Sequence, residues 1–378
     1  MSKLVIDLTF NPVGGALSQI KEIINNIDLY IFDEILFYST RENNHLFQDV
    51  NTNKIKVIFV PFSNKSIILR SFWAQFILPF HLLIDKSNIL FCPGNISPIL
   101  NFTKKAQWIG TVGPFEKNFI YFFGLKQRII LFINKYLMIL SSYTSDLVIF
   151  ESQYTKNLFV KKYGQKENRS SVVYIGNDEF FYSTLGKSDE NYSMYGDFIL
   201  VVAHLYPYKN IEILLESFHD SELHLRDLKI VIAGNIVDKI YNKKLLAKIR
   251  DLGLIESIIF LGGVEKKKLR DLYSYCTMLV FTSPFENFAY TLVEAMGCAA
   301  PIIATNTTAM PETCGDAVLY FSPNNHKELS CCILKYLDNP DLRNEYKRKA
   351  SIKSMTYETY SEVNQITANL LNAINRSK

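Results

Sequence analysis

The chain has 378 residues, of which 48% are hydrophobic and 21% are charged, and its formal net charge is +4. A chain of this length is expected to form two or three domains, and its composition excludes an intrinsically disordered protein. The net charge is too small to indicate a protein that binds nucleic acid. We therefore expect no nucleic-acid partner.

The positive charge is concentrated in the first half of the chain. Residues 1–180 contain 19 Lys and Arg against 14 Asp and Glu, whereas residues 181–378 contain 22 against 23. The N-terminal segment lacks a secretory signal because Asp7 interrupts its only apolar stretch, so we expect a cytoplasmic protein. The uncharged apolar run Ser71–Ile84 has 14 residues, and about 18 are needed for a spanning helix.

Six candidate strands occur in the first half, and most of them are continuous apolar runs. Such runs are typical of strands that are buried on both faces of a parallel sheet. The candidates are Leu4–Phe10, Lys56–Phe62, Asn88–Gly94, Trp108–Val112, Leu147–Ser152 and Val172–Gly176.

A polar stretch, Tyr182–Asp197, is predicted to be a linker, and the strand rhythm restarts after it. Helical patterns such as Asn210–Phe218 and Phe288–Met296 lie between the later strands. These strands are Phe198–Leu205, Leu228–Gly234, Ser257–Gly262, Met278–Ser283 and Pro301–Thr305. Alternation of strands and helices in both halves predicts an α/β protein with two doubly wound domains.

We expect a first domain over residues 1–180, a second over residues 181–356, and a C-terminal helix over residues 357–378 that can cross back to the first domain. In parallel α/β sheets, ligands bind beyond the carboxyl ends of the strands. With two facing domains, the cleft between them is the expected site.

Residues 278–323 carry the most informative pattern. A strand is followed by a turn, Pro284–Asn287, and by a helix that begins near Phe288. The N-terminal amides of such a helix can bind an anion such as a diphosphate. Glu286 follows the strand and Glu294 lies about two turns into the helix, so the two carboxylates can accept hydrogen bonds from different parts of one ligand. Alternatively, Glu286 caps the helix and Glu294 is a solvated surface acid.

This stretch resembles the retaining glycosyltransferases of family 4, which have two facing Rossmann-like domains, the GT-B fold. Their signature is a Glu, seven residues, a second Glu on the helix, a small-residue turn, a buried strand and a Pro-Glu pair. The matching residues are Glu286, Glu294, Ala295-Met296-Gly297, Pro301-Ile302-Ile303-Ala304, Pro311-Glu312 and Gly315-Asp316-Ala317.

The resemblance is looser elsewhere in the chain. Val202–Asn210 resembles the family's strand and Lys-Asn phosphate site, which implies that Lys209 lies near the donor's diphosphate. Gly14 and Gly15 follow the first strand, where the family's loop approaches the donor phosphates, and small residues there allow close approach of the backbone. An ordinary strand–helix turn is the alternative for these two glycines.

The resemblance implies transfer of a sugar from a nucleotide-sugar donor, with retention at the anomeric carbon, to a glycan or lipid-linked saccharide acceptor in cell-surface polysaccharide synthesis. Lys209 and the amides near Phe288 are implied to stabilise charge on the leaving diphosphate, which is commonly the largest catalytic contribution. Glu286 is implied to hold the donor sugar's hydroxyls and Glu294 to bind the ribose. No metal and no other cofactor is implied.

Three departures from the family pattern affect this site. His204 stands where the family usually has an Arg, and a protonated imidazole would make activity fall with rising pH, whereas the alternative is a packing residue. Asn287, Phe288 and Ala289 replace Gly-Phe-Gly, but Asn287 tolerates unusual backbone angles, so its amide can still contact the donor. Residues 111–115 lack the His that many members carry near the reacting carbon, so the acceptor-activating base stays unassigned.

Two other functions remain open at this point. A degenerate relative would bind a nucleotide sugar or a partner without turnover, which the residue at position 204 favours and Lys209, Glu286 and Glu294 oppose. A nucleotide-sugar epimerase of the same fold is the second alternative.

The basic first half is expected to be the acceptor side, because the donor motifs lie almost wholly in residues 198–312. Its basic residues are interleaved with Phe, Tyr and Ile, which fits peripheral contact with anionic lipid at the inner face of the plasma membrane. Core helices with solvated basic faces are the alternative. The basic residues are Lys104, Lys105, Lys117, Lys126, Arg128 and Lys135.

Overall fold

The structure, a computed structural model, describes residues 3–12, 15–27, 31–48, 53–63, 66–85, 87–100, 102–176, 178–182, 195–357 and 359–375. The chain divides into two compact units. The first comprises Met1–Ile120, Gly124–Gly176 and Thr359–Lys378, and the second comprises Tyr121–Phe123 and Asn177–Glu358. Most of the predicted linker, residues 183–194, lies outside the described residues.

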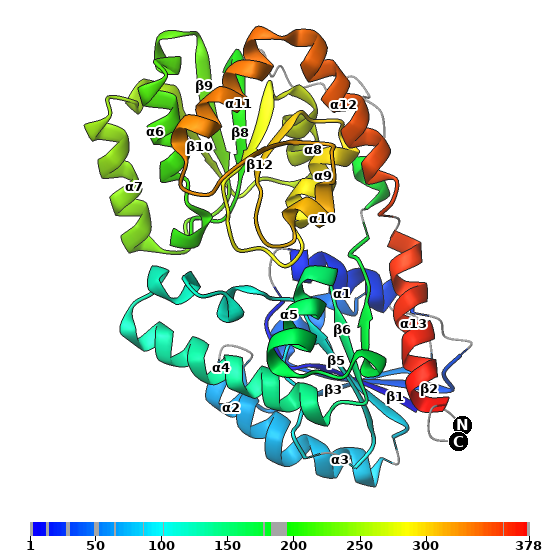
Figure 1. The fold of residues 1–378 in the computed structure, drawn as a ribbon. Coiled ribbons are helices and arrows are strands. Elements are labelled where there is room, and N and C mark those ends of the chain that lie inside the picture. The colour runs from blue at the N-terminus through cyan, green and yellow to red at the C-terminus, as the bar shows by residue number, and fades with distance from the viewer. Residues whose placement is uncertain are drawn as a thin grey trace. The chain divides into compact units, whose positions relative to one another are not determined.

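The first unit is built on a sheet of seven parallel strands in the order β3-β2-β1-β4-β5-β6-β7 (Figure 1). Strands β1 and β4 pair with Leu4 opposite Ile89, so their buried residues lie side by side. The strands are β1 (Lys3–Leu8), β2 (Glu34–Ser39), β3 (Ile55–Phe59), β4 (Ile89–Cys92), β5 (Lys104–Ile109), β6 (Leu147–Phe150) and β7 (Ser170–Val172).

One face of this sheet is covered by the first and last helices of the chain. Ile20 of α1 (Gly15–Asn26) and Leu370 of α13 (Thr359–Asn375) belong to one buried cluster with Leu4. The C-terminal helix therefore packs in the first unit.

The opposite face carries the remaining helices of the unit. Leu78 packs in one cluster with Val5, and Met138 packs in another with Val148. Short 3-10 segments, η1 (Arg41–Leu46), η3 (Gly113–Phe115), η4 (Phe119–Phe122) and η5 (Glu167–Arg169), lie in the loops. The helices of this face are α2 (Ile67–Phe72), the π-helical η2 (Trp73–Ile77), α3 (Leu78–Ile84), α4 (Leu125–Thr144) and α5 (Gln153–Tyr163).

The second unit contains a sheet of six parallel strands in the order β10-β9-β8-β11-β12-β13 (Figure 1). The strands are β8 (Asp197–Val202), β9 (Leu228–Ala233), β10 (Ile258–Gly262), β11 (Met278–Phe281), β12 (Ile302–Thr305) and β13 (Leu319–Phe321). The α-helices are α6 (Glu212–Asp220), α7 (Lys239–Asp251), α8 (Lys266–Tyr275), α9 (Tyr290–Gly297), α10 (Met310–Cys314), α11 (His326–Asp338) and α12 (Pro340–Ser354). The 3-10 segments are η6 (Glu179–Phe181), η8 (Pro207–Lys209), η9 (Leu223–Leu225) and η10 (Ile255–Ser257).

The α/β class and the two Rossmann-like units predicted from the sequence are confirmed. The sequence pattern missed β2 and β13, and β5 begins at Lys104, four residues before the predicted start at Trp108. Helix α9 begins at Tyr290, two residues after the predicted start. Among the described residues, no helix combines the length and the apolar character needed to cross a membrane.

Candidate active site

The predicted donor residues follow the two central strands of the second sheet. Lys209 ends η8, which comes after β8, and Glu286 follows β11. The sheet order reverses between these two strands, since the chain runs outward to β9 and β10 on one side and to β12 and β13 on the other. Ligands bind at such a switch point in parallel α/β sheets. The sheet thereby brings together two side chains that are 77 positions apart.

Lys209 and Glu286 form an ion pair, with 2.5 Å between Nζ and Oε1 and side chains that are only 17% and 18% exposed. Ser283 Oγ donates to the same carboxylate oxygen over 2.7 Å. Burial disfavours the charged amine, but the Glu286 carboxylate and the oxygen of Tyr208 outweigh it, so the pKa of Lys209 lies above its ordinary value. The amine is therefore a fixed cation at the carboxyl edge of the sheet.

Hydroxyl groups tie the surrounding loops to one another. Thr282 Oγ1 donates to the carbonyl of Lys209 over 2.6 Å, and Thr305 Oγ1 donates to the carbonyl of Ser283 over 2.7 Å. The amide of Glu286 donates to Thr308 Oγ1 over 3.3 Å. These bonds fix the backbone on both sides of the ion pair.

Glu294 lies on α9 with 9% of its surface exposed. The hydroxyl of Tyr273, on α8, donates to Glu294 Oε2 over 2.9 Å. Burial raises the pKa of Glu294 to about 7, although the hydrogen bond from Tyr273 and the charge of Lys266 act to lower it. The surface-acid alternative for Glu294 is therefore excluded by its burial.

The N-terminal end of α9 carries no acidic residue in its first turn and no side-chain cap, because its N-cap is Ala289. Alanine is a poor N-cap residue, so a ligand anion would stabilise this end more than it would a capped helix. Asn287 and Phe288 precede the cap and are both buried, and Phe288 contacts the ring of Tyr357 edge-on with 5.4 Å between centroids.

His204 lies in the loop after β8, where its Nδ1 accepts a hydrogen bond from the amide of Asn235 over 3.1 Å. Burial and the charge of Lys209 both lower the pKa of His204. The imidazole is therefore neutral at pH 7, with its proton on Nε2, and it can donate one uncharged hydrogen bond. Its role in the site stays a prediction.

The two predicted glycines lie in the first unit. Gly15 is the first residue of α1, directly after the loop that follows β1, and Gly14 lies outside the described residues. The donor contact of both glycines stays a prediction.

Aromatic side chains beside the ion pair were not predicted from the sequence. Phe122 contacts the ring of Phe285 with 5.8 Å between centroids, and Phe123 contacts Tyr208 at 6.3 Å. Phe122 and Phe123 come from the short segment Tyr121–Phe123 that groups with the second unit. No spacing in the sequence signals this grouping.

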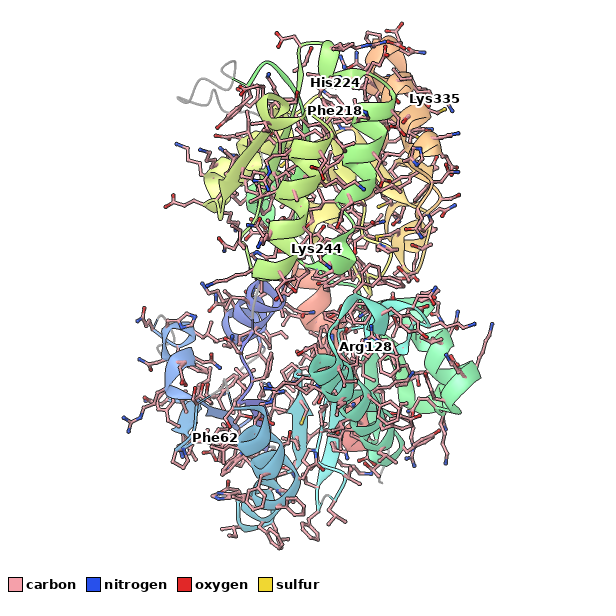
Figure 2. All side chains as sticks on the ribbon, turned by 90° about the vertical axis from the view of Figure 1, so that its left-hand side faces the viewer. Phe62, Arg128, Phe218, His224, Lys244 and Lys335 are labelled. Carbon is pink, nitrogen blue, oxygen red and sulfur yellow. The ribbon has the colours of Figure 1, made fainter. Side chains whose placement is uncertain are left out.

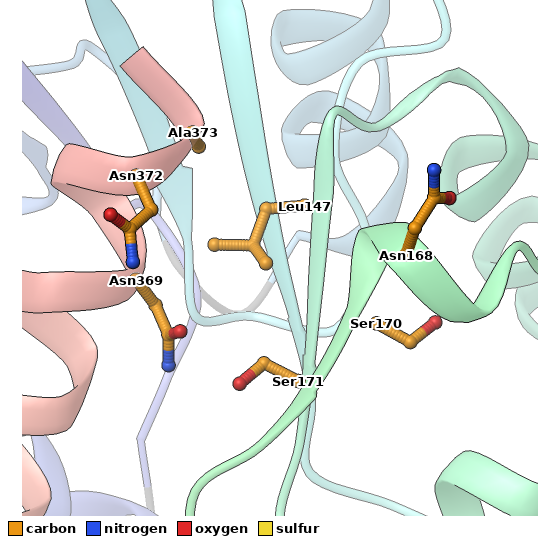
Figure 3. A pocket seen from close by; sticks show the side chains of 7 residues that line it. All are labelled: Leu147, Asn168, Ser170, Ser171, Asn369, Asn372 and Ala373. Carbon is orange, nitrogen blue, oxygen red and sulfur yellow. The ribbon is translucent and has the colours of Figure 1, made fainter. Parts of the chain in front are cut away.

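A small pocket lies in the first unit between α13 and the start of β6 and β7 (Figure 3). Asn369 and Asn372 face Leu147 and Ser171 across it. Leu147 is the first residue of β6, so the pocket lies at the amino edge of the sheet. Ligands of parallel sheets bind at the opposite edge, and this pocket is therefore not the predicted site. Among the residues that the structure describes, no cluster of three or more His, Cys, Asp or Glu side chains is placed to hold a metal ion.

Parts of the chain are similar in sequence to known glycosyltransferases. The chain is 28% identical over 169 residues to the serotype-specific mannosyltransferase WbdA of Escherichia coli, and this match covers 44% of this chain and 21% of WbdA. It is 27% identical over 233 residues to an N-acetylgalactosaminyltransferase of Campylobacter jejuni that acts on a diphospho-undecaprenol-linked saccharide by name, and the match covers 60% of each chain. The chain thus spans between a fifth and three fifths of these relatives.

The fold also matches solved structures over nearly the whole chain. The crystal structure of Anabaena HepE in complex with UDP and glucose superposes with a TM-score of 0.75 at 19% identity, covering 98% of this chain and 100% of HepE. This likeness establishes the GT-B fold. Residues 189–353, which lie in the second unit, match the family described as glycosyl transferases group 1.

Proposed function

We propose that this protein is a retaining, metal-independent glycosyltransferase that moves a sugar from a nucleotide-sugar donor to a glycan or lipid-linked saccharide acceptor. The observation that carries the proposal is the ion pair of Lys209 and Glu286 at the switch point of the second sheet. A fixed cation and a fixed carboxylate at this edge match the two chemical halves of a nucleotide sugar, its diphosphate and its sugar hydroxyls.

The reaction breaks the bond between the anomeric carbon and the diphosphate oxygen, and negative charge develops on the leaving group. Lys209 neutralises part of that charge, and the uncapped end of α9 adds amide dipoles. Glu286 accepts hydrogen bonds from the donor sugar, and Glu294 accepts from the nucleotide ribose. His204 donates an uncharged hydrogen bond from Nε2 to a phosphate oxygen.

The relatives support the two substrate classes. HepE was crystallised with UDP and glucose, and the Campylobacter relative is named for a lipid-linked acceptor. We propose that this chain uses the same classes, as a cytoplasmic protein that meets its acceptor at the inner face of an anionic membrane, in cell-surface polysaccharide synthesis.

The test is a panel of UDP- and GDP-sugars, with release of nucleoside diphosphate measured with and without saccharide acceptors. Lys209→Met and Glu286→Gln should each lower turnover by about 10²–10³-fold. The matched control is Lys244→Met, which removes an exposed amine on α7 of the same unit. Product anomeric configuration by NMR tests retention, and turnover in excess EDTA tests metal independence. Donor binding without any turnover would refute the transferase in favour of a binding module.

A further inference from the structure

Helix α4 has two apolar stripes instead of one. Met138 and Ile139 face the sheet and are buried. A second set of apolar residues recurs at spacings of three and four residues. Because an α-helix turns by about 100° per residue, these residues fall within an arc of about 100° on the outer side of the helix. Its members are each about half exposed or more and comprise Ile129, Phe132, Ile133, Tyr136, Leu140 and Tyr143.

The continuous helical segment α2–η2–α3 has the same property. Trp73, Leu78 and Leu82 pack under it against the sheet. Its exposed apolar side chains again recur at spacings of three and four residues, and all are at least 50% exposed. They are Leu69, Phe72, Phe76, Phe80 and Leu83.

These two outer stripes belong to one layer of helices. Val5, Leu90 and Cys92 under α2–α3, and Val148 under α4, point to the same face of the sheet by strand register. Figures 1 and 2 show α4 beside α2 and α3 in both views. We call the exposed apolar side chains of these helices the outer apolar face.

The outer apolar face is too concentrated to be ordinary surface. Fifteen of the twenty-nine large hydrophobic side chains that are exposed among the described residues lie on the first unit between Leu69 and Tyr143. Single exposed apolar residues are normal, but contiguous patches of them mark interaction sites.

The charge in the sequence that forms this face is mainly positive. Residues 60–145 contain nine Lys and Arg but only two acids, Asp85 and Glu116. Both acids are hydrogen-bonded within the protein, Asp85 to the hydroxyl of Tyr38 and Glu116 to that of Tyr154. An apolar face with mainly basic residues in the surrounding sequence complements an anionic bilayer, where the rings enter the interface and the cations meet lipid phosphates.

Two of the basic residues expected to contact lipid are engaged elsewhere. Lys105 is fully buried, and its amine donates to the carbonyl of Pro98 and to Thr144 Oγ1. Lys104 pairs with Asp146. Lys117 and Lys126 are exposed, so they are the cations to test.

We infer that the outer apolar face of α2–η2–α3 and α4 docks this protein on an anionic lipid leaflet. The inference depends on the proposed function in one respect only, which is that docking would bring the protein to its lipid-linked acceptor. Binding to lipid requires no donor and no turnover.

The test is co-sedimentation of the full chain with phosphatidylcholine vesicles that contain or lack phosphatidylglycerol. Phe132→Ser/Ile133→Ser should weaken binding to anionic vesicles by about tenfold or more, because two inserted side chains are lost. Lys117→Gln/Lys126→Gln should weaken it and reduce its dependence on salt. The matched control is Leu225→Ser/Ile240→Ser, two residues of the second unit that are 73% and 72% exposed.

Turnover with a water-soluble acceptor and the thermal midpoint are measured on every variant, and both should match the wild type. No binding to anionic vesicles, or binding that the control variant loses equally, overturns the inference. So does a dimer of the wild type that Phe132→Ser/Ile133→Ser dissociates without any vesicle binding, since a second copy then covers the face. Absence of turnover in the wild type refutes the proposed function alone and leaves the vesicle result interpretable.

Discussion

The buried carboxyl group of Glu294 predicts how the stability of the second unit depends on pH. Its pKa is raised by burial from 4.5 to about 7, so between these values the folded chain holds a proton that the unfolded chain has lost. The free energy of unfolding therefore falls as pH rises through this window. With about 1.4 kcal/mol per pKa unit, the full effect is about 3 kcal/mol, and most of it lies between pH 5 and pH 8.

Glu294→Gln removes this titration and keeps nearly the same shape, since the Tyr273 hydroxyl can donate to the amide oxygen. We expect the variant and the wild type to have similar stability at pH 5. At pH 8 the variant should be more stable by about 2 kcal/mol. Glu256→Gln, at an exposed position of the same unit, is the matched control.

The assay has to follow the second unit, and tryptophan fluorescence does not. Both tryptophans, Trp73 and Trp108, lie in the first unit. Amide hydrogen exchange of peptides from residues 278–305 reports the opening of β11, α9 and β12 directly. Equal pH dependence of exchange in wild type and Glu294→Gln would refute the reasoning, as would an equal change in peptides of the first unit.

Three further predictions concern the carboxyl edge of the second sheet. Glu286→Gln should lower the pKa of the Lys209 amine, because burial then acts without the opposing carboxylate; the rate of amine labelling against pH measures this, and an unchanged pKa would count against the ion pair. His204→Gln should keep the shape of the wild-type rate profile between pH 7 and 8.5, because the imidazole is already neutral there, and a basic limb present only in the wild type would contradict this. Gly234→Ala should yield little folded protein in expression trials, since φ is +155° and the new Cβ would lie 1.9 Å from the carbonyl oxygen of Ala203; a wild-type melting temperature would disprove it.

Much of the fold could be predicted from apolar runs, because a strand covered on both faces has no polar positions to confuse the pattern. Strand β2 was missed although Ile35–Tyr38 is apolar, since so short a run does not distinguish a strand from a buried helical turn. Strand β13 has only three residues and gives less signal still.

The start of β5 was misplaced for a tertiary reason. Its second residue, Lys105, is fully buried, which no sequence pattern predicts for a lysine. The carbonyl of Pro98 and the hydroxyl of Thr144 satisfy its amine, and burial lowers the pKa of Lys105 to about 8. Pro98 is seven positions away, but Thr144 is 39 positions away, so the start of the strand depends in part on a contact that is distant in the sequence.

Within the site, the two glutamates could be predicted from the sequence, but the hydrogen bonds that fix the surrounding loops could not. Glu286 and Glu294 belong to a long sequence signature. Thr282, Thr305 and Thr308 fix the loops through single hydrogen bonds across the sheet edge, and threonines are too common in loops for spacing to mark them.

The Lys209–Glu286 pair costs free energy to bury, and this cost bears on the role of the pair in the site. Removing two charges from water offsets most of their mutual attraction, so a buried ion pair contributes little net stability. The second unit nevertheless holds this pair at the edge of the sheet with several loop hydrogen bonds and not in its apolar core. In the proposed function, a donor diphosphate becomes the partner of Lys209 while sugar hydroxyls donate to Glu286. Lys209 and Glu286 then each keep a partner when the substrate binds. This lowers the free-energy cost of bringing an anion into a buried site.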